Sequence, residues 1–204
     1  MMAGAAAGTG LDWSSVGVSE EDRARARHHT RAALASGQVY EPQFFEPGEW
    51  TALRILVDLI IPADERSGSA TDSGAPEFID FLMVEGDDAQ RTAVRGGFAW
   101  LDAESRKRFD ASFVSVTEAN RLTILDEIAW PDRAPAELSH GVRFFNRMRD
   151  LTASAFWSSK MGVDDLEYIG NFMIPVWNGC PDEQLERLGV ERPGTQENDT
   201  KDGG

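Results

Sequence analysis

Large apolar residues recur at intervals of three and four between residues 44 and 62, which is the clearest periodic pattern in the chain. The residues of this stripe are Trp50, Leu53, Leu56, Val57, Ile60 and Ile61, and Leu59 widens it. The spacing predicts a helix that is buried over much of its surface and ends at Pro62. A second stripe follows Ser139 and consists of Phe144, Phe145, Met148, Leu151, Thr152, Ala155 and Phe156. It predicts a helix of about five turns that ends at Gly162, followed by a short helix from Val163 to about Ile169.

Capping residues and breakers predict the remaining helices. These helices run from Ser19 to Ser36, from Gly74 to Gly86, from Asp87 or Asp88 onward, from Thr117 to Pro131, and from Asp182 to Leu188. No convincing strand pair and no alternation of strands with helices is visible in the sequence. We therefore predict an all-α protein, a single irregular helical domain of about six to eight helices with disordered termini.

The composition changes along the chain and predicts four segments. They are a disordered Ala- and Gly-rich tail over residues 1–18, a basic helix and linker over 19–43, a helical domain over 44–189, and a disordered polar tail over 190–204. The basic helix is too polar for a core helix, so we expect it on an acidic surface, either of this chain or of a partner. Its adjacent His28 and His29 point about 100° apart in a helix, which disfavours a shared metal.

Two local features leave alternatives open. Gly96 and Gly97 lie inside a predicted helix and indicate either a close helix approach or a local break. Asp64, Glu65 and Asp72 lie in a loop without the spacing of an EF-hand, so we expect a solvated turn in preference to a calcium site.

The stretch from Phe156 to Cys180 stands out because large apolar residues follow one another between glycine and proline breakers. Burying one such side chain is worth roughly 1.5 to 3 kcal/mol, so they must lie on the body of this domain or on another protein. The residues concerned are Phe172, Met173, Ile174, Val176 and Trp177. Cys180 has no histidine nearby in sequence to form a thiolate, so we interpret it as a buried or intermolecular thiol and not as a nucleophile.

Charge and motif content exclude several classes of function. The net charge is −15, with 35 Asp and Glu against 20 Lys and Arg, which makes nucleic acids and anionic membranes poor partners. A single cysteine excludes an intrachain disulfide, a CxxC zinc site and a protein-encoded iron–sulfur cluster. The sequence contains no GxGxxG, GxxxxGK[ST] or GxSxG motif.

The sequence shows neither a run of about 20 apolar residues nor an export signal at its start. We therefore expect a cytoplasmic protein, or a periplasmic one if it is exported with a partner or if a signal was removed.

Several motifs, taken together in their order and spacing, resemble the gluconate 2-dehydrogenase subunit 3 family over about residues 44 to 189. They are Leu59-Ile60-Ile61-Pro62-Ala63-Asp64, Gly74-Ala75-Pro76-Glu77-Phe78-Ile79-Asp80, Gly97-Phe98-Ala99-Trp100-Leu101-Asp102, Tyr168-Ile169-Gly170-Asn171 and Trp177-Asn178-Gly179-Cys180-Pro181. The resemblance implies the non-catalytic small subunit of a membrane-associated or periplasmic sugar or polyol dehydrogenase. Its large subunit would be an FAD-dependent glucose-methanol-choline oxidoreductase, with no cofactor in this chain. The family commonly carries a twin-arginine signal, which this sequence does not show.

An obligate partner would explain the apolar run, because Trp and other large side chains supply most of the binding energy at interfaces. We therefore predict that the partner-binding residues are Phe172, Met173, Ile174, Val176, Trp177 and Cys180. The rival hypotheses are a free-standing cofactor-dependent enzyme and a general chaperone or scaffold.

Overall fold

The computed structural model of the chain describes residues 18–168, 170 and 179–190. The chain divides into two compact units, residues 1–168 and residues 169–204. Every regular element within the described residues is helical, which confirms the all-α prediction. The first unit contains α1 (Glu20–Ser36), α2 (Pro47–Ile60), α3 (Ala75–Glu85), α4 (Asp88–Phe109), α5 (Glu118–Ile128), the short 3-10 helix η2 (Ala136–Leu138), α6 (Ser139–Ser158) and α7 (Lys160–Asp165), and the second contains α8 (Asp182–Leu188).

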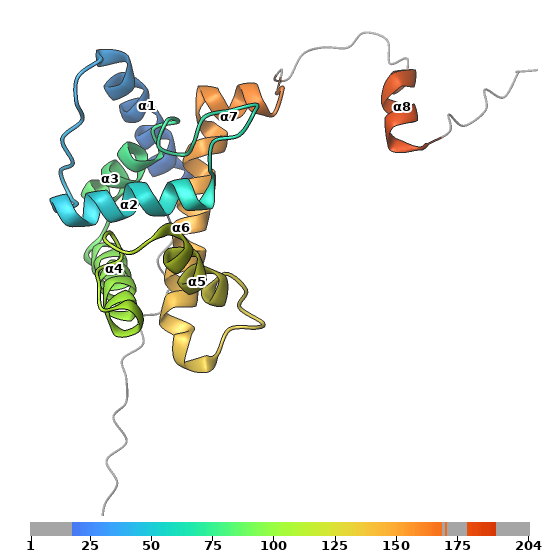
Figure 1. Cartoon of the computed structure of the whole chain (residues 1–204). Helices are drawn as coiled ribbons and strands as arrows, with labels where there is room; N and C mark the ends of the chain where they lie inside the picture. Colours follow the sequence, from blue (N-terminus) through green and yellow to red (C-terminus); the bar gives the residue numbers. More distant parts are fainter. Residues whose placement is uncertain (1–17, 169, 171–178, 191–204) are drawn as a thin grey trace, which may run out of the picture. The chain divides into compact units, whose positions relative to one another are not determined.

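The helix α6 is the centre of the first unit, and α2, α3, α4, α5 and α7 all contact it (Figure 1). The predicted apolar stripe of this helix is confirmed as its buried face: Phe144, Phe145, Met148, Leu151, Thr152, Ala155 and Phe156. The one polar residue of the stripe is satisfied locally, because the Thr152 hydroxyl donates to the Met148 carbonyl at 2.7 Å. The predicted domain boundaries stay a prediction, and most of the predicted tails lies outside the described residues.

Gly97 allows α4 to lie against α6. A Cβ atom at Gly97 would lie 1.8 Å from Cδ2 of Phe144, whereas a Cβ atom at Gly96 would meet nothing within 4 Å. The helix α4 continues without interruption through both glycines. Of the two alternatives predicted for this pair, the close approach is therefore the correct one, and it depends on Gly97 alone.

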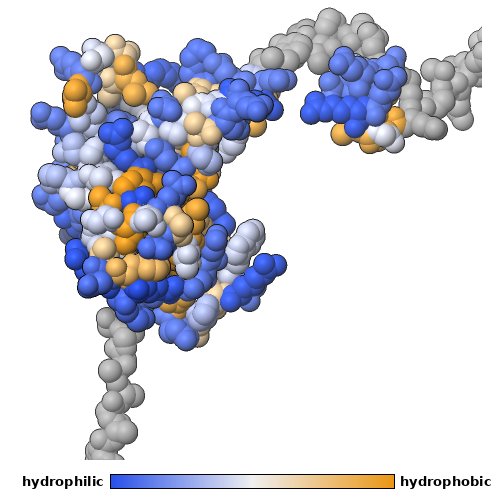
Figure 2. All heavy atoms as spheres, viewed as in Figure 1, coloured by the Kyte–Doolittle hydropathy of each residue, from blue (hydrophilic) through white to orange (hydrophobic). Residues whose placement is uncertain are grey.

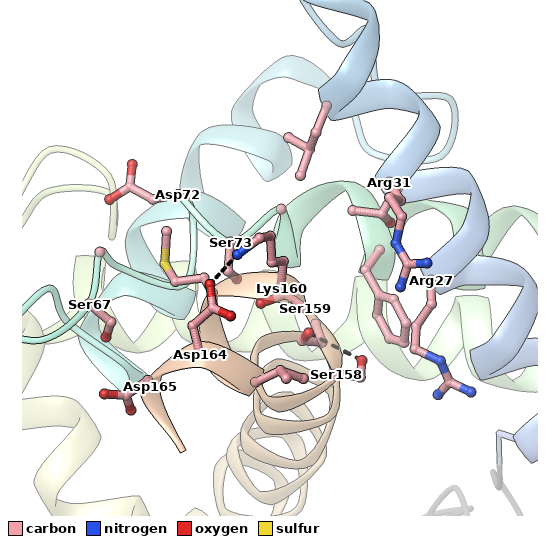
Figure 3. A pocket seen from close by; sticks show the side chains of 18 of the residues that line it. Arg27, Arg31, Ser67, Asp72, Ser73, Ser158, Ser159, Lys160, Asp164 and Asp165 are labelled. Atoms are coloured by element: carbon pink, nitrogen blue, oxygen red, sulfur yellow. Dashed lines mark hydrogen bonds and ion pairs between the residues drawn. The ribbon is translucent and has the colours of Figure 1, made fainter. Parts of the chain in front are cut away.

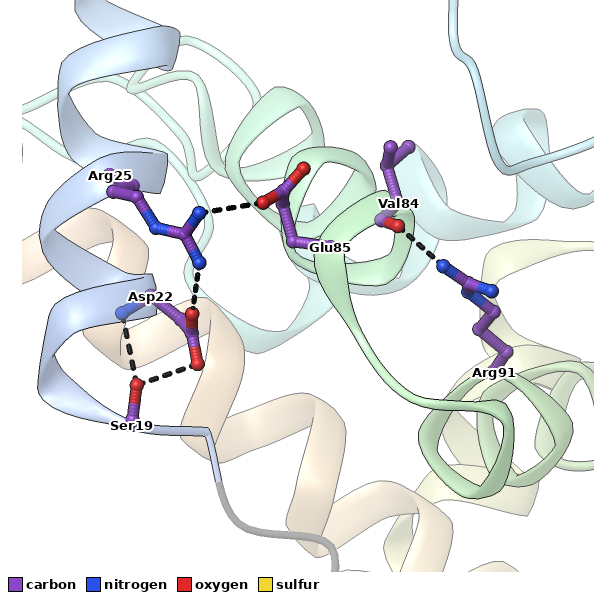
Figure 4. A network of polar contacts seen from close by, with 6 residues as sticks. All are labelled: Ser19, Asp22, Arg25, Val84, Glu85 and Arg91. Atoms are coloured by element: carbon purple, nitrogen blue, oxygen red, sulfur yellow. Dashed lines mark hydrogen bonds and ion pairs between the residues drawn. The ribbon is translucent and has the colours of Figure 1, made fainter.

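The basic helix α1 packs on α3 and so lies on a surface of this chain. Its small residues Ala26 and Thr30 are buried, which allows a helix with few large apolar residues to lie close to its neighbour. Arg25 of α1 reaches Glu85 of α3 at 2.7 Å and Asp22 at 2.5 Å (Figure 4). Ser19 caps the helix as predicted.

The linker between α1 and α2 is held by one buried carboxylate of α3. Asp80 is fully buried and accepts four hydrogen bonds from this linker. The donors are the Tyr40 hydroxyl at 2.9 Å and the backbone amides of Gln43, Phe44 and Phe45 at 2.8, 3.0 and 3.2 Å. A charged group is buried here at an acceptable cost because each oxygen has two donors.

The end of α3 is fixed from α4. Arg91 donates to the carbonyl oxygens of Met83 at 2.9 Å and Val84 at 2.5 Å (Figure 4). These carbonyls belong to the last turn of α3, where no partner exists within the helix, so a side chain takes that place.

The predicted boundary between the last two helices of the first unit is wrong. The helix α6 ends at Ser158, four residues before the predicted stop at Gly162, and α7 spans Lys160–Asp165. Ser159 is the capping residue, and its hydroxyl accepts a hydrogen bond from the Gly162 amide at 3.1 Å. A Cβ atom at Gly162 would lie 2.2 Å from the Phe156 carbonyl oxygen. Gly162 therefore permits the sharp turn between the helices and does not end either of them.

Candidate functional site

Most of the predicted partner-binding segment cannot be placed in the fold. Phe172, Met173, Ile174, Val176 and Trp177 lie outside the described residues, and their role stays a prediction. Cys180 is described and is partly exposed. The candidate site described below lies in the first unit.

Exposed apolar residues gather in sequence around α7. Trp157 near the end of α6 is 40% exposed, and Leu166 and Tyr168 just after α7 are 57% and 60% exposed. Large apolar side chains at this exposure are candidates for burial by a partner. Apolar residues also gather on one face of this unit, over α2 and among hydrophilic residues (Figure 2). The partly buried apolar residues of α2 are Trp50, Ile55, Leu59 and Ile60.

A groove of about 1120 Å³ lies between α1 and α7, and we call it the α1–α7 groove. Its walls are α1, the loop over residues 66–74 with the start of α3, and the junction of α6 with α7. Figure 3 shows Arg27 and Arg31 reaching from α1 on one side, Ser67 and Asp72 on the other, and Lys160 with Asp164 between them.

Apolar side chains from four elements line the α1–α7 groove. They are Leu34 of α1, Phe78 of α3, Ala155 of α6, and Met161 and Val163 of α7. Phe78 and Ala155 are buried, whereas Leu34 is 50% exposed. This apolar surface therefore remains partly open to solvent in the isolated first unit.

The loop over residues 66–74 lies very close to α1 and to α7 because of two glycines. Gly74 has a φ of 85°, in the left-handed region that other residues avoid, and a Cβ atom there would lie 2.7 Å from Thr30 Cγ2. A Cβ atom at Gly68 would lie 3.1 Å from the terminal methyl of Met161. Both glycines let the loop follow the groove where a larger residue would fill it.

The predicted solvated turn agrees with how the loop uses its carboxylates. Asp64 accepts hydrogen bonds from the backbone amides of Ser67 and Arg66 at 2.9 and 2.8 Å, and these two bonds hold the pKa of its carboxyl below the usual range. Asp72 accepts from the amide of Ser69 at 2.9 Å. The two carboxylates stabilise their own turns.

The acidic residues on the α7 side of the groove have basic partners. Lys160 binds Asp164 one turn along the helix. Arg66 Nε lies 3.1 Å from Asp165 Oδ1, within the range of an ion pair although not aligned as a hydrogen bond, and Arg66 Nη2 lies 3.9 Å from Glu167. Because the basic partner of each pair is exposed, each pair contributes roughly 0 to 1 kcal/mol to stability, but the pairs neutralise this wall.

The α1 side differs, because only one of its two arginines has a carboxylate partner. Arg27 binds Glu20 at 2.7 Å. Arg31 is exposed, lines the groove, and has no carboxylate within 4.0 Å among the residues described by the structure. The guanidinium of Arg31 is therefore available to an acidic group from outside.

A second cluster of ionisable residues lies between α1, α3 and the linker. The ring of His29 stacks on Phe81 with 4.5 Å between centroids. Burial, and then the charge of Asp80, raise the pKa of Tyr40 above its usual range. Burial likewise raises the pKa of Glu77. The hydrogen bonds of Asp80 all go to the linker, so this carboxylate holds the linker between α1 and α2 against α3.

Sequence reasoning missed the residues that form the α1–α7 groove. The only signal in the sequence was Leu34, a single large apolar residue near the end of a helix of polar residues and alanines. Met161 and Val163 were assigned to different helices, so that their shared position on α7 was not anticipated.

Among the described residues, no helix combines the length and the apolar character that crossing a bilayer would require. Neither the curated proteins nor the solved structures yielded a match to this chain.

The family model described as gluconate 2-dehydrogenase subunit 3 matches residues 47–179. The match begins at the first residue of α2 and includes all helices through α7, so α1 and α8 lie outside it. It covers more than half of the chain and confirms the family resemblance inferred from the motifs. The description is that of one subunit of a dehydrogenase complex, which implies a partner subunit. The chain therefore belongs to the gluconate 2-dehydrogenase subunit 3 family.

Proposed function

We propose that this chain is the non-catalytic small subunit of a sugar or polyol dehydrogenase. It binds and stabilises a large subunit of the FAD-dependent glucose-methanol-choline type. The observation that carries the proposal is the family match over residues 47–179, which includes the central helix α6 together with α2, α3, α4, α5 and α7. Flavin binding and substrate oxidation belong to the large subunit in this proposal.

The surface of the first unit supports a binding role. Trp157, Leu166 and Tyr168 are exposed in one stretch of chain, and the α1–α7 groove adds an apolar surface beside them. Aromatic and large aliphatic residues of this kind supply most of the energy at protein interfaces when a partner covers them. A subunit that assembles with a larger protein would bury this surface.

The packing of the first unit supports the same role. The central helix α6 contacts α2, α3, α4, α5 and α7, and Asp80 fixes the linker that joins α1 to α2. A binding surface built on such a body loses little conformational entropy on association. This arrangement suits a subunit that stabilises its partner by offering a preformed surface.

The test is to express the chain with and without a glucose-methanol-choline type flavoprotein from the same organism. Size-exclusion chromatography with absorbance at flavin wavelengths, followed by a dye-linked sugar oxidation assay, gives both readouts. We expect this chain to elute with flavin, and to accompany sugar oxidation, only when the flavoprotein is present. Flavin or sugar oxidation associated with this chain alone would overturn the proposal and favour a free-standing enzyme. Binding to many unrelated unfolded proteins would favour a chaperone.

A further inference from the structure

The lining of the α1–α7 groove contains as many basic as acidic residues, but the ion pairing differs between its walls. The acidic residues of its α7 wall have the partners Lys160 and Arg66, whereas Arg31 on the α1 wall has no carboxylate partner among the described residues. The chain as a whole has 35 acidic residues against 20 basic ones, so internal carboxylates are abundant. Arg31 nevertheless points to the groove (Figure 3), and no carboxylate of the described part of the chain lies within 4.0 Å of its guanidinium.

The apolar surface next to Arg31 completes the chemistry of the groove. Leu34 lies three residues further along α1, on the same helix face, and is 50% exposed. Met161 and Val163 line the groove from α7 and are partly exposed. A side chain that entered here would contact an apolar surface below an unpaired guanidinium.

We propose that the α1–α7 groove receives a segment of the large subunit that places an acidic side chain on Arg31 and an apolar side chain against Leu34 and Met161. This inference rests on the proposed function, because it names the part of this chain that the large subunit contacts. A guanidinium offers five N–H donors in a planar fork, which suits a carboxylate in particular. The apolar residue of the segment supplies the hydrophobic contact and the acidic residue supplies its orientation.

A protein segment fits the surroundings of the groove better than a small anion does. Ser158 and Glu167 line the groove, and their sequence neighbours Trp157, Leu166 and Tyr168 are exposed apolar residues. A small ligand inside the groove would leave those three side chains in water, whereas a protein surface that continues beyond the groove would cover them.

The α1 wall gives the groove a feature that the family match does not contain. The match begins at residue 47, whereas Arg27, Arg31 and Leu34 belong to α1. The residues that select the acidic segment therefore lie in the part of the chain that precedes the matched residues.

The test compares single variants of the full chain for their affinity to the purified large subunit. Arg31→Glu reverses the unpaired charge, and Leu34→Glu places a charge on the apolar surface. Arg149→Glu is the control for the first, because Arg149 is an exposed arginine of α6 outside the groove lining. Leu122→Glu is the control for the second, because Leu122 is a 39% exposed leucine of α5. Each pair has the same change in net charge.

We expect Arg31→Glu and Leu34→Glu each to raise Kd at least tenfold, and both controls to change it less than twofold. Arg31→Lys keeps the positive charge but loses the planar guanidinium. The Kd of this variant should lie between that of Arg31→Glu and that of the chain without substitutions. Circular dichroism melting shows whether each variant is folded, and Arg31 at the surface provides a test even if Leu34→Glu unfolds.

Three other outcomes would contradict either the proposed function or the docking of the acidic segment in the groove. If the unchanged chain does not bind the large subunit, the proposed function itself fails. If it binds and the groove variants bind equally well, the proposed function stands and the groove inference is wrong. If the groove variants bind equally well but the complex loses activity, the groove holds a small molecule, and the inference is again wrong.

Discussion

Gly97 is the position at which adding one methyl group should disturb the fold most sharply. A Cβ atom there would lie 1.8 Å from Cδ2 and 2.4 Å from Cγ and Cε2 of Phe144. The nearest of these distances is little more than half of the 3.4 Å at which ordinary van der Waals contact begins. Phe144 is 1% exposed, and its ring also packs edge-on against Phe98 with 5.1 Å between centroids. The ring therefore has no open space into which it can move.

The neighbouring Gly96 provides a matched control. Both glycines lie inside α4, so replacement of either by alanine gains about 1 kcal/mol of helix propensity. Overpacking a well-packed core costs about 1 to 3 kcal/mol, and the short contact at Gly97 places that variant at the upper end. The gain in helix propensity is the same for both variants and cancels when they are compared. We therefore expect Gly97→Ala to be about 3 kcal/mol less stable than Gly96→Ala.

Urea and thermal unfolding followed by circular dichroism measure this difference. At about 2 to 4 °C per kcal/mol for a chain of this size, the two melting temperatures should differ by about 6 to 12 °C. Phe144→Leu, which replaces the ring by a smaller branched side chain, should recover some of the loss when combined with Gly97→Ala and none with Gly96→Ala. Equal stability of Gly97→Ala and Gly96→Ala would refute the close approach of α4 to α6.

Three further substitutions test other parts of the fold. Asp80→Asn should destabilise the chain by about 3 kcal/mol, because an amide cannot accept four hydrogen bonds, whereas the exposed Asp126→Asn should change stability by less than about 0.5 kcal/mol. Glu77→Gln should raise the melting temperature at pH 7, because burial raises the pKa of Glu77 and its ionisation then opposes folding. This gain in melting temperature should vanish below about pH 4, where the carboxyl group is protonated in the folded and the unfolded chain. A gain that is independent of pH would contradict this cause. Gly162→Ala should lower the melting temperature through its clash with the Phe156 carbonyl oxygen, and an unchanged melting temperature would show that the turn between α6 and α7 can relax.

The helices were predictable where a strong local signal exists. The apolar stripes of α2 and α6 are long enough to define a buried face, and the caps at Ser19, Asp87 and Thr117 lie where the sequence predicts them. The boundary at α6 was missed because Gly162 resembles a helix stop, whereas the true signal is Ser159, a capping residue three positions earlier. A glycine that is required because a side chain would clash looks the same in sequence as a glycine that is required by a left-handed backbone conformation.

The α1–α7 groove could not be predicted, for a different physical reason. Its lining comes from three separate parts of the chain, within residues 27–34, 66–78 and 155–167. Each part contributes only a few polar and apolar residues, too few to form a periodic pattern. The role of Asp80 was equally hidden, because a buried carboxylate is identified by donors that lie 35 to 40 positions away.

Hydrogen exchange of the chain alone and in complex with its flavoprotein large subunit would test the proposed assembly and its docking surface together. Exchange of backbone amides reports which segments become protected on binding. We predict stronger protection over residues 27–34 of α1 and 160–168 around α7 in the complex, with no change over α5 (Glu118–Ile128). A complex that forms while these two segments exchange as they do in the isolated chain would contradict the docking surface. The absence of any complex would contradict the small-subunit function.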